Sequence, residues 1–316
     1  MIDQIACAIK NGEDFLVASH INPEGDAIGS TLAMTHALRG MNKKVVAYNK
    51  DPLPYNLRFL PGSDQILREL PSGFSPGTAI ILDCGNLDRM GKAKKLLDGI
   101  EVINIDHHAT NPLFGTLNWV LAEASSTGEM LVPILKKIGA RFTPEISSCI
   151  YTAILTDTGC FKFSNTSSEV LRVAGEMIEL GADPAVIAHH LFDSQTAGNL
   201  KLLGMVLNTL QVELGDSYAS AHVTKEMFRS TQTDHDATEG FVDYLRSIEG
   251  VEVAALFREE DERKVKVSLR SKGEVDVLKI AEGLGGGGHK AAAGCLLEGN
   301  IKEGKKQVFE KVRTTI

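Results

Sequence analysis

The chain has 316 residues and a mass of 34.1 kDa, about twice the size of a typical domain, so we expect two domains. Apolar residues make up 43% of the chain and charged residues 23%, which excludes disordered, collagen-like and disulfide-scaffold proteins. The net charge of -8 argues against a protein that covers long duplex nucleic acid with a broad cationic surface. It leaves room for a small anionic ligand bound at a local site.

The cysteines and the amino terminus predict a cytoplasmic protein. The five cysteines form an odd, scattered set without a Cys-x-x-Cys pair, which favours reduced thiols: Cys7, Cys84, Cys149, Cys160 and Cys295. Acidic residues stand near the amino terminus, where a signal peptide would have a basic start and an apolar run. No stretch approaches the roughly 20 apolar residues that span a bilayer, so we expect no membrane partner.

The first half of the chain has the alternating pattern of an α/β unit. Short apolar runs predict strands at 15–19, 44–48, 78–83 and 101–106. Helical spacing of apolar residues predicts a helix at 26–41, and helix-forming stretches occur at 55–70 and 89–97. This alternation predicts a parallel sheet with helices on both faces.

The pattern of predicted elements changes twice in the rest of the chain, first to helices alone and then to mixed strands and helices. Helices are predicted at 126–139, 144–155, 168–180 and 184–210, with Gly181 as a C-cap. Beyond Gly215, strands are predicted at 218–223, 251–257, 265–269 and 293–297, with helices at 238–247, at 275–282 and at the carboxyl terminus. The charged stretch 258–266 is typical of a solvated hairpin tip. We therefore divide the chain into a first domain at 1–190, a linker helix at 191–211 and a smaller α/β domain at 212–316.

Metal-ligating side chains stand at the ends of predicted elements. In open parallel sheets, ligands bind at the carboxyl ends of the strands. Three of the predicted strands end in such residues, and a fourth position follows an apolar helix: His20, Glu24 and Asp26; Asp83; Asp106, His107 and His108; and Asp157. A single aspartate there more often caps a helix or forms a turn. The convergence of four positions instead favours a metal centre.

The types of these side chains indicate which metals would bind. Imidazole and carboxylate groups suit manganese, iron or zinc, and the large share of oxygen ligands favours manganese or magnesium. Dinuclear sites of this composition are a standard device for hydrolysing phosphate esters. The sequence therefore predicts a two-metal site.

A second group of residues predicts an anion site near the carboxyl terminus. Glycines at 285–288 precede His289 and allow backbone amides to approach a ligand closely. Such a run is as often only a flexible hinge. Arg270 and Ser271 end a strand in the same domain, and the Arg270 guanidinium suits a phosphate, which favours the anion site.

These motifs carry a resemblance to a known family. The segment HINPEGDAIGS at 20–30, together with Asp83, Asp106-His107-His108 and 156–159, resembles the metal-binding motifs of the DHH phosphoesterase superfamily. The segment 268–294 resembles the nucleotide-binding DHHA1 domain. The combination is similar to the oligoribonuclease and pAp-phosphatase branch, often called nanoRNase A. The resemblance implies a parallel-sheet DHH domain joined by a helical linker to a smaller α/β DHHA1 domain.

The resemblance also implies roles for single residues. His20, Glu24 and Asp83 would hold one divalent ion, and Asp26, Asp83, His107 and Asp157 a second, with Mn²⁺ favoured over Mg²⁺ or Co²⁺. Asp106 would orient a histidine, and His108 would protonate the leaving oxygen. Substrate would be bound by Arg270, Ser271, Gly286, Gly287, Gly288 and His289. Glu24 departs from the family, which commonly has aspartate at that position.

The implied activity is hydrolysis of short oligoribonucleotides to mononucleotides and of pAp to AMP and phosphate. The partners would be short RNA and nucleotide phosphates rather than long duplexes, and the protein would be a monomer or homodimer. Two alternatives remain open. One is a soluble phosphodiesterase for cyclic di-AMP or pApA, and the other is a nucleotide-binding protein without catalysis.

Overall fold

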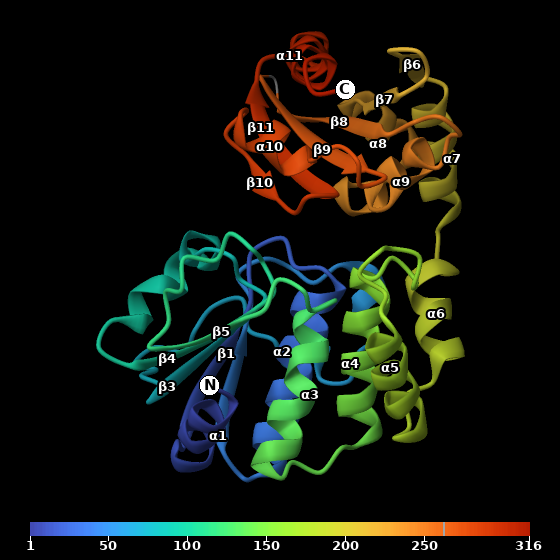
Figure 1. Ribbon diagram of the computed structural model, residues 1–316. Coiled ribbons are helices and arrows are strands. Elements are labelled where there is room, and N and C mark those ends of the chain that lie inside the picture. Colours follow the sequence, from blue (N-terminus) through green and yellow to red (C-terminus); the bar gives the residue numbers. More distant parts are fainter. Residues whose placement is uncertain (262) are drawn as a thin grey trace. The chain divides into compact units, whose positions relative to one another are not determined.

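The computed structural model describes residues 1–261 and 263–316, which form two compact units, Met1–Ser194 and Gln195–Ile316 (Figure 1). The hairpin tip predicted at 258–266 includes Glu262, which lies outside the described residues. No helix in the described part of the chain is long and apolar enough to cross a membrane.

The first unit contains the predicted parallel sheet. Its strand order is β2-β1-β3-β4-β5, and every neighbouring pair is parallel. The strands are β1 (Asp14–Ala18), β2 (Lys44–Tyr48), β3 (Thr78–Leu82), β4 (Glu101–Asp106) and β5 (Leu117–Val120). Sequence patterning misses β5, whose residues are only partly buried. Along β1, Phe15 and Val17 enter one core while Leu16 and Ala18 enter another, so both faces are covered.

The two faces are covered differently. One core holds apolar residues of six helices, of which the first five are α1 (Ile2–Asn11), α2 (Gly25–Gly40), α3 (Thr127–Ile138), α4 (Pro144–Asp157) and α5 (Ser168–Glu179). The helix α6 (Pro184–Phe192) follows them in the chain and contributes Ile187. The opposite face is covered by the 3₁₀ segment η3 (Leu87–Leu97) through Met90, Ala93 and Leu97.

The predictions of α-helices at 55–70 and 89–97 are wrong, because both stretches contain 3₁₀ segments instead. The first stretch contains only the 3₁₀ turns η1 (Tyr55–Leu57) and η2 (Ser63–Gln65), because Pro61 and Gly62 stand between them. The second, η3, is kinked at Gly91, where φ is 61°. A left-handed φ interrupts the regular hydrogen-bond pattern and suits glycine.

Glycines allow α2, α3 and α4 to approach closely. A Cβ on Gly25 would overlap the side chain of Thr156, and one on Gly29 would lie 2.5 Å from the carbonyl oxygen of Cys149. Gly128 similarly lies against Ala153. Because of these contacts, the start of α2 lies beside the end of α4.

The second unit is built on a six-stranded mixed sheet with the order β10-β11-β9-β8-β7-β6. Its strands are β6 (Gln211–Glu213), β7 (Tyr218–Val223), β8 (Val253–Asp261), β9 (Lys264–Ser271), β10 (Gly287–Gly288) and β11 (Ala292–Glu298). The pair β7 and β8 is parallel and the other pairs are antiparallel. The α/β class predicted for this half of the chain is confirmed.

Helices cover both faces of this sheet (Figure 1). On one face lie α10 (Val277–Glu282) and α11 (Ile301–Arg313); on the other lie α7 (Ala197–Leu207), α8 (Lys225–Thr231) and α9 (Phe241–Arg246). The helix predicted at 184–210 is instead two helices, α6 and α7. Thr196 starts α7 by accepting a hydrogen bond from the backbone of Asn199, and α7 buries Leu202 and Val206 in the second unit.

Candidate metal centre

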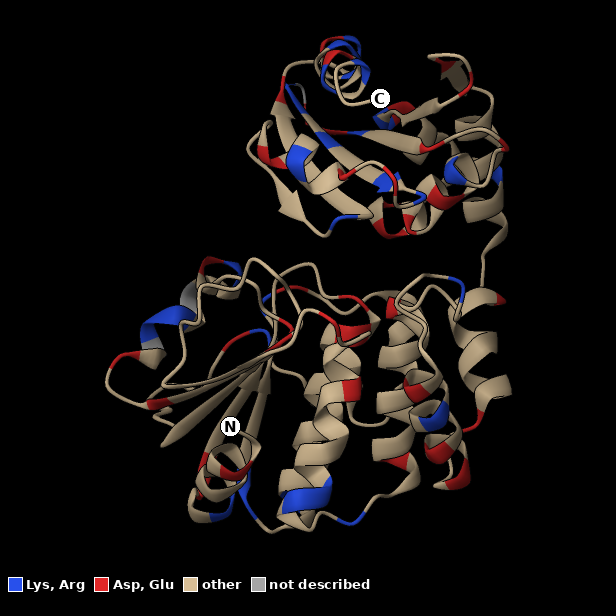
Figure 2. Cartoon of the chain, in the orientation of Figure 1, with Lys and Arg blue, Asp and Glu red and all other residues tan. Residues whose placement is uncertain are grey.

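The predicted ligands of the first unit meet at the carboxyl edge of the parallel sheet. His20 follows β1, Asp83 follows β3, and His107 and His108 follow β4. The start of α2 supplies Asp26, and the end of α4 supplies Asp157. Figure 2 shows acidic residues gathered on the loops at this edge.

Asp83 lies at the middle of the cluster. Its Oδ2 is 3.3 Å from Nε2 of His20, and its Oδ1 is 3.5 Å from Nε2 of His107 and from Nδ1 of His108. The side chain is buried, and neither oxygen accepts a hydrogen bond from any described residue. The backbone of Asp83 adopts a left-handed φ of 51°, a strained conformation that persists at functional sites. Such a buried carboxylate, with both oxygens open to further coordination, fits a position between two cations.

His20 presents one nitrogen to the carboxylates. Its Nε2 lies 2.8 Å from Oε1 of Glu24, whereas its Nδ1 lies 2.7 Å from the carbonyl oxygen of Ile21. The loop is held from β2, because Nδ2 of Asn49 donates to the carbonyl oxygen of His20. The Glu24 side chain is 54% exposed, so it lies at the rim of the cluster.

His107 repeats this arrangement on the other side of Asp83. Its Nε2 lies 3.2 Å from Oδ2 of Asp157 and 3.7 Å from Oδ2 of Asp26. Its Nδ1 lies 3.3 Å from the carbonyl oxygen of Ala124. A backbone carbonyl on one ring nitrogen and carboxylates at the other is the usual environment of a metal-ligating histidine.

Asp26 is fixed by the amino terminus of α3. Its two oxygens accept hydrogen bonds from the backbone N–H groups of Thr127 and Gly128, at 2.7 and 2.9 Å, and Ser30 donates a third. These backbone donors have no partners within their own helix. A residue on α2 therefore satisfies the start of α3, and its carboxylate is held in one orientation.

The Asp106 carboxylate lies near Asp83 and is hydrogen-bonded to its neighbours. Its Oδ1 accepts from Nδ1 of His108 at 2.7 Å and from the backbone of His107, and its Oδ2 accepts from Asn111. A Cβ on Gly85 would lie 3.1 Å from the His108 ring, so glycine leaves room for that ring.

Two effects on the pKa values of the cluster oppose each other: burial disfavours the charged forms, and the attraction between imidazoles and carboxylates favours them. Burial disfavours charged imidazoles, but Glu24 and Asp83 raise the pKa of His20 to about 10. In the same way, Asp83, Asp157 and Asp26 raise the pKa of His107 to about 11 against burial. Burial also opposes ionisation of Asp83, yet the imidazoles hold its pKa well below the ordinary value. Burial and the charge of Asp83 raise the pKa of Asp26 to about 7.

The donor atoms fit a pair of divalent cations. Among the described residues of the first unit, His20, Glu24 and Asp83 bring ligand atoms within 4.8 Å of one another, and so do Asp26, Asp83 and His107. Both groups share Asp83. Imidazole nitrogens with several carboxylate oxygens are ligands for a divalent metal of the manganese, iron or zinc type.

The predicted substrate residues of the second unit lie at the ends of β9 and β10. Arg270 is half-buried, and its Nη1 donates to the carbonyl oxygen of Leu269. Ser271 is buried, and its hydroxyl has no hydrogen-bond partner among the described residues. The Arg270 side chain is therefore the more accessible of the two.

Close packing accounts for part of the glycine run. A Cβ on Gly286 would overlap the carbonyl oxygen of Gly294, and Gly288 has a φ of 142°. Gly287 pairs with Gly294 in the β10–β11 ladder and is exposed. The backbone N–H of His289 donates to the carbonyl oxygen of Ala292 at 2.7 Å, which makes a tight turn. The run is thus an ordered sheet edge as well as a potential anion site.

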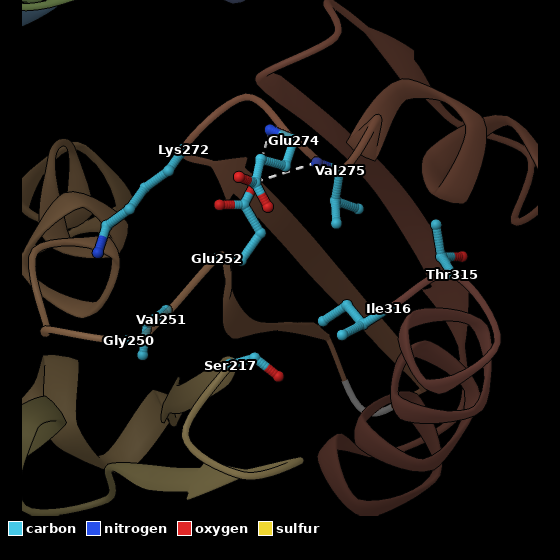
Figure 3. A pocket seen from close by; sticks show the side chains of 9 residues that line it. All are labelled: Ser217, Gly250, Val251, Glu252, Lys272, Glu274, Val275, Thr315 and Ile316. Atoms are coloured by element: carbon cyan, nitrogen blue, oxygen red, sulfur yellow. Dashed lines mark hydrogen bonds between the residues drawn. The ribbon is translucent and has the colours of Figure 1, made fainter.

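A separate pocket of about 550 Å³ opens on the second unit (Figure 3). Glu252 lies in its wall and accepts hydrogen bonds from the backbone N–H groups of Glu274 and Val275. Its lining does not include the predicted substrate residues. Glu252 therefore has a structural role, because it fixes the turn after β9.

Three residues that support the centre were missed in the sequence. Asn49 follows β2 and holds the His20 loop, so the rule for strand ends could have found it. Asn111 lies three residues beyond His108 and binds Asp106. Arg89 lies in η3 and contacts His20, a distant pairing for which the sequence contains no pattern.

Comparison with known proteins relates the whole chain to one family. The DHH family N-terminal domain matches residues 14–154, and the DHHA1 domain matches residues 215–316. The bifunctional oligoribonuclease and PAP phosphatase NrnA of Thermus thermophilus is 37% identical, over 94% of this chain and 88% of that protein. The protein of the same name from Bacillus subtilis is 29% identical, over 89% of this chain and 88% of its own length.

Solved structures agree with this relationship. An exopolyphosphatase-related protein from Bacteroides fragilis has a TM-score of 0.91 at 28% identity, covering 99% of this chain and 95% of its own. RecJ of Thermus thermophilus, solved in complex with Mn²⁺, has a TM-score of 0.57 at 14% identity, covering 99% of this chain and 55% of its own. The RecJ likeness shows the fold alone.

The fold and the histidine–carboxylate cluster are those of a hydrolase that acts on phosphate esters and uses divalent metal ions. The chain belongs to the DHH and DHHA1 phosphoesterase family, in the branch of the NrnA proteins.

Proposed function

We propose that this protein hydrolyses short oligoribonucleotides, from dinucleotides upward, to mononucleotides, and pAp to AMP and phosphate. Two relatives that align over most of the chain are named as bifunctional oligoribonucleases and PAP phosphatases. The structural observation that carries the proposal is the buried Asp83 carboxylate between His20 and His107. Its two oxygens suit a ligand shared by two metals.

The proposed ligands form two sets around Asp83. His20, Glu24 and Asp83 would hold one ion, and Asp26, Asp83, His107 and Asp157 would hold the other. The ions would acidify a water molecule and offset negative charge on the phosphoryl oxygens. We propose Mn²⁺ as the native metal, with Mg²⁺ and Co²⁺ as the competing choices, because oxygen ligands predominate over imidazole.

We propose His108 as the group that protonates the leaving oxygen. Nδ1 of His108 donates a hydrogen bond to Asp106, so Nδ1 keeps its proton. Nε2 is then the atom that would exchange a proton with substrate. Asp106 thus acts through His108 and is a positioning residue. Asn111 and the His107 backbone N–H keep the Asp106 carboxylate in place.

The second unit is proposed to hold the nucleotide. Arg270 offers a guanidinium suited to a terminal phosphate, and the glycine run with His289 offers backbone next to it. We also propose Ser271 as a substrate-binding residue, since its buried hydroxyl has no hydrogen-bond partner among the described residues. Holding one end of a short chain selects by length and needs no base sequence. We propose residues 1–190 and 212–316 as the metal and nucleotide domains, joined through 191–211.

The proposed setting is the cytoplasm, with the protein as a monomer or homodimer. None of the five cysteines forms a disulfide in the described structure, which supports a reducing compartment. The proposed partners are short RNA and nucleotide phosphates.

The test is a panel of substrates offered to metal-free protein supplemented with Mn²⁺, Mg²⁺, Co²⁺ or Zn²⁺. It contains pAp, RNA dinucleotides, a longer RNA, cyclic di-AMP, pApA and pyrophosphate. We expect mononucleotides from dinucleotides and phosphate from pAp. Preferred hydrolysis of cyclic di-AMP or pApA would support the cyclic-dinucleotide alternative. No turnover with any metal, despite nucleotide binding, would support the non-catalytic alternative.

Arg270→Ala tests whether Arg270 binds the substrate without taking part in the chemical step. If the guanidinium contacts the substrate equally in the ground and transition states, KM rises and kcat stays unchanged. Lys302→Ala is the control for removal of a positive charge, because Lys302 is exposed on α11. A fall in kcat at unchanged KM would contradict the binding role.

A further inference from the structure

Arg89 contacts the metal cluster from a segment that none of the recognised motifs includes. Its Nη2 lies 2.9 Å from Nδ1 of His20. The backbones of the two segments are also joined, because the N–H of Ile21 donates to the carbonyl oxygen of Arg89 at 2.8 Å. Arg89 is half-buried, so its guanidinium is reachable by a ligand.

The Nδ1 atom of His20 has two close partners that it cannot satisfy together. The carbonyl oxygen of Ile21, at 2.7 Å, requires a proton on Nδ1. The Arg89 guanidinium only donates, so it requires a lone pair on the same atom. With Nε2 as a metal ligand, the neutral ring keeps its proton on Nδ1 and donates to Ile21. The Arg89 guanidinium then faces the Nδ1–H group of His20, to which it cannot donate, and it needs another acceptor.

The charge of the centre indicates what that acceptor is. Glu24, Asp26, Asp83 and Asp157 balance two divalent cations without excess, so an entering phosphate ester adds a negative charge that nothing in this set offsets. A guanidinium matches phosphate oxygens in shape as well as in charge. Arg89 can supply this charge from the His20 side of the cluster.

We propose that Arg89 binds the phosphoryl group of the substrate in the metal-loaded protein. This inference rests on the proposed function, because it assumes a phosphate ester at the metal centre. It makes Arg89 a substrate-contacting residue, whose guanidinium lies beside His20 and is available to phosphate.

The experiment compares Arg89→Gln, Arg89→Lys and the wild-type full-length chain, each loaded with Mn²⁺. Calorimetry measures the Kd for inorganic phosphate and, separately, the Kd for Mn²⁺. We expect Arg89→Gln to weaken phosphate binding by about tenfold or more and Arg89→Lys by less, since a lysine keeps the charge but not the fork. Mn²⁺ affinity should stay within about threefold.

Lys94→Gln is the matched control. Lys94 lies in η3 as well, forms a 2.6 Å ion pair with Asp88, and has no contact with the cluster among the described interactions. Its loss should leave the Kd for phosphate unchanged. Melting temperatures of all variants show whether each is folded.

Two results would overturn the inference. One is an unchanged Kd for phosphate in Arg89→Gln, and the other is a loss of Mn²⁺ affinity that parallels the loss of phosphate, which would make Arg89 a support for His20. Hydrolysis of bis-p-nitrophenyl phosphate by the wild type is scored separately. A wild type that binds phosphate through Arg89 but hydrolyses no ester would contradict the proposed function and leave this inference standing.

Discussion

Nδ1 of His108 donates a 2.7 Å hydrogen bond to Oδ1 of the fully buried Asp106. Asn111 donates to Oδ2 of the same carboxylate at 2.6 Å. A carboxylate only accepts, so this pair fixes which nitrogen of His108 carries the proton in the neutral ring. The remaining nitrogen is then the one that could exchange a proton with a substrate, as proposed for His108.

Asp106→Asn should uncouple this arrangement while conserving shape. The amide of asparagine can donate to Nδ1 of His108 and so favours the tautomer with its proton on Nε2. Nε2 could then no longer accept a proton and later return it to the leaving oxygen. We expect kcat to fall on the order of 10²- to 10⁴-fold, with a smaller change in KM. Steady-state kinetics with a dinucleotide and with bis-p-nitrophenyl phosphate measure both. An activated leaving group needs less protonation, so an equal loss with both esters would contradict the acid role of His108.

Asp83→Asn tests the shared ligand. At a free metal concentration of about 100 Kd, binding stabilises the folded wild type by about 2.7 kcal/mol, which is a clear rise in the melting temperature. The variant should lose that rise, because both proposed sites share the carboxylate. Asp88→Asn, exposed on η3, is the control and should keep it. A full metal-induced rise in Asp83→Asn would argue against a bridging role.

The sequence predicts the architecture well where periodicity is strong. The buried parallel strands and the long helices were found because their apolar patterns are regular. The C-cap of α5 is Leu180, and Gly181, predicted as the cap, follows it with a left-handed φ of 107°. The segment 55–70 was misread because its helix-forming residues are divided by Pro61 and Gly62. The short strand β5 and helix α1 were not predicted, although α1 buries Ile5 and Ile9.

The candidate site was predictable because strand ends meet in space. His20, Asp83 and His107 occupy equivalent places after three parallel strands, so their convergence follows from topology. The supporting contacts do not follow from it. Asp26 binds the start of α3, about a hundred residues away, and Arg89 contacts His20 from η3. These pairings depend on packing that only the three-dimensional structure defines.

Metal binding should release protons. Burial opposes charge on both rings, but the carboxylates raise the pKa of His20 to about 10 and that of His107 to about 11, so we expect both rings to be protonated at pH 8 in the metal-free protein. A ligating imidazole is neutral, so saturation at pH 8 should release about two protons per chain from these rings, and affinity should rise with pH up to about 11, the pKa of His107. Calorimetry in HEPES and in Tris measures the release through their different ionisation enthalpies. Equal enthalpies in the two buffers would contradict the predicted release.

Gly25→Ala should disturb the centre without removing a ligand. Its new Cβ would overlap Thr156 on α4, so α2 and α4 must separate, and Asp26 on α2 would move relative to Asp157 on α4. Overpacking of this kind costs about 1–3 kcal/mol of unfolding free energy. We expect a lower midpoint of urea denaturation and a weaker affinity for the metal ion that these two aspartates are proposed to bind. Gly40→Ala, near the other end of α2, has no atom within 4 Å of its new Cβ and should be neutral or slightly stabilising. If the two variants had equal stability and equal metal affinity, the close approach at Gly25 would not be what sets the distance between the two carboxylates.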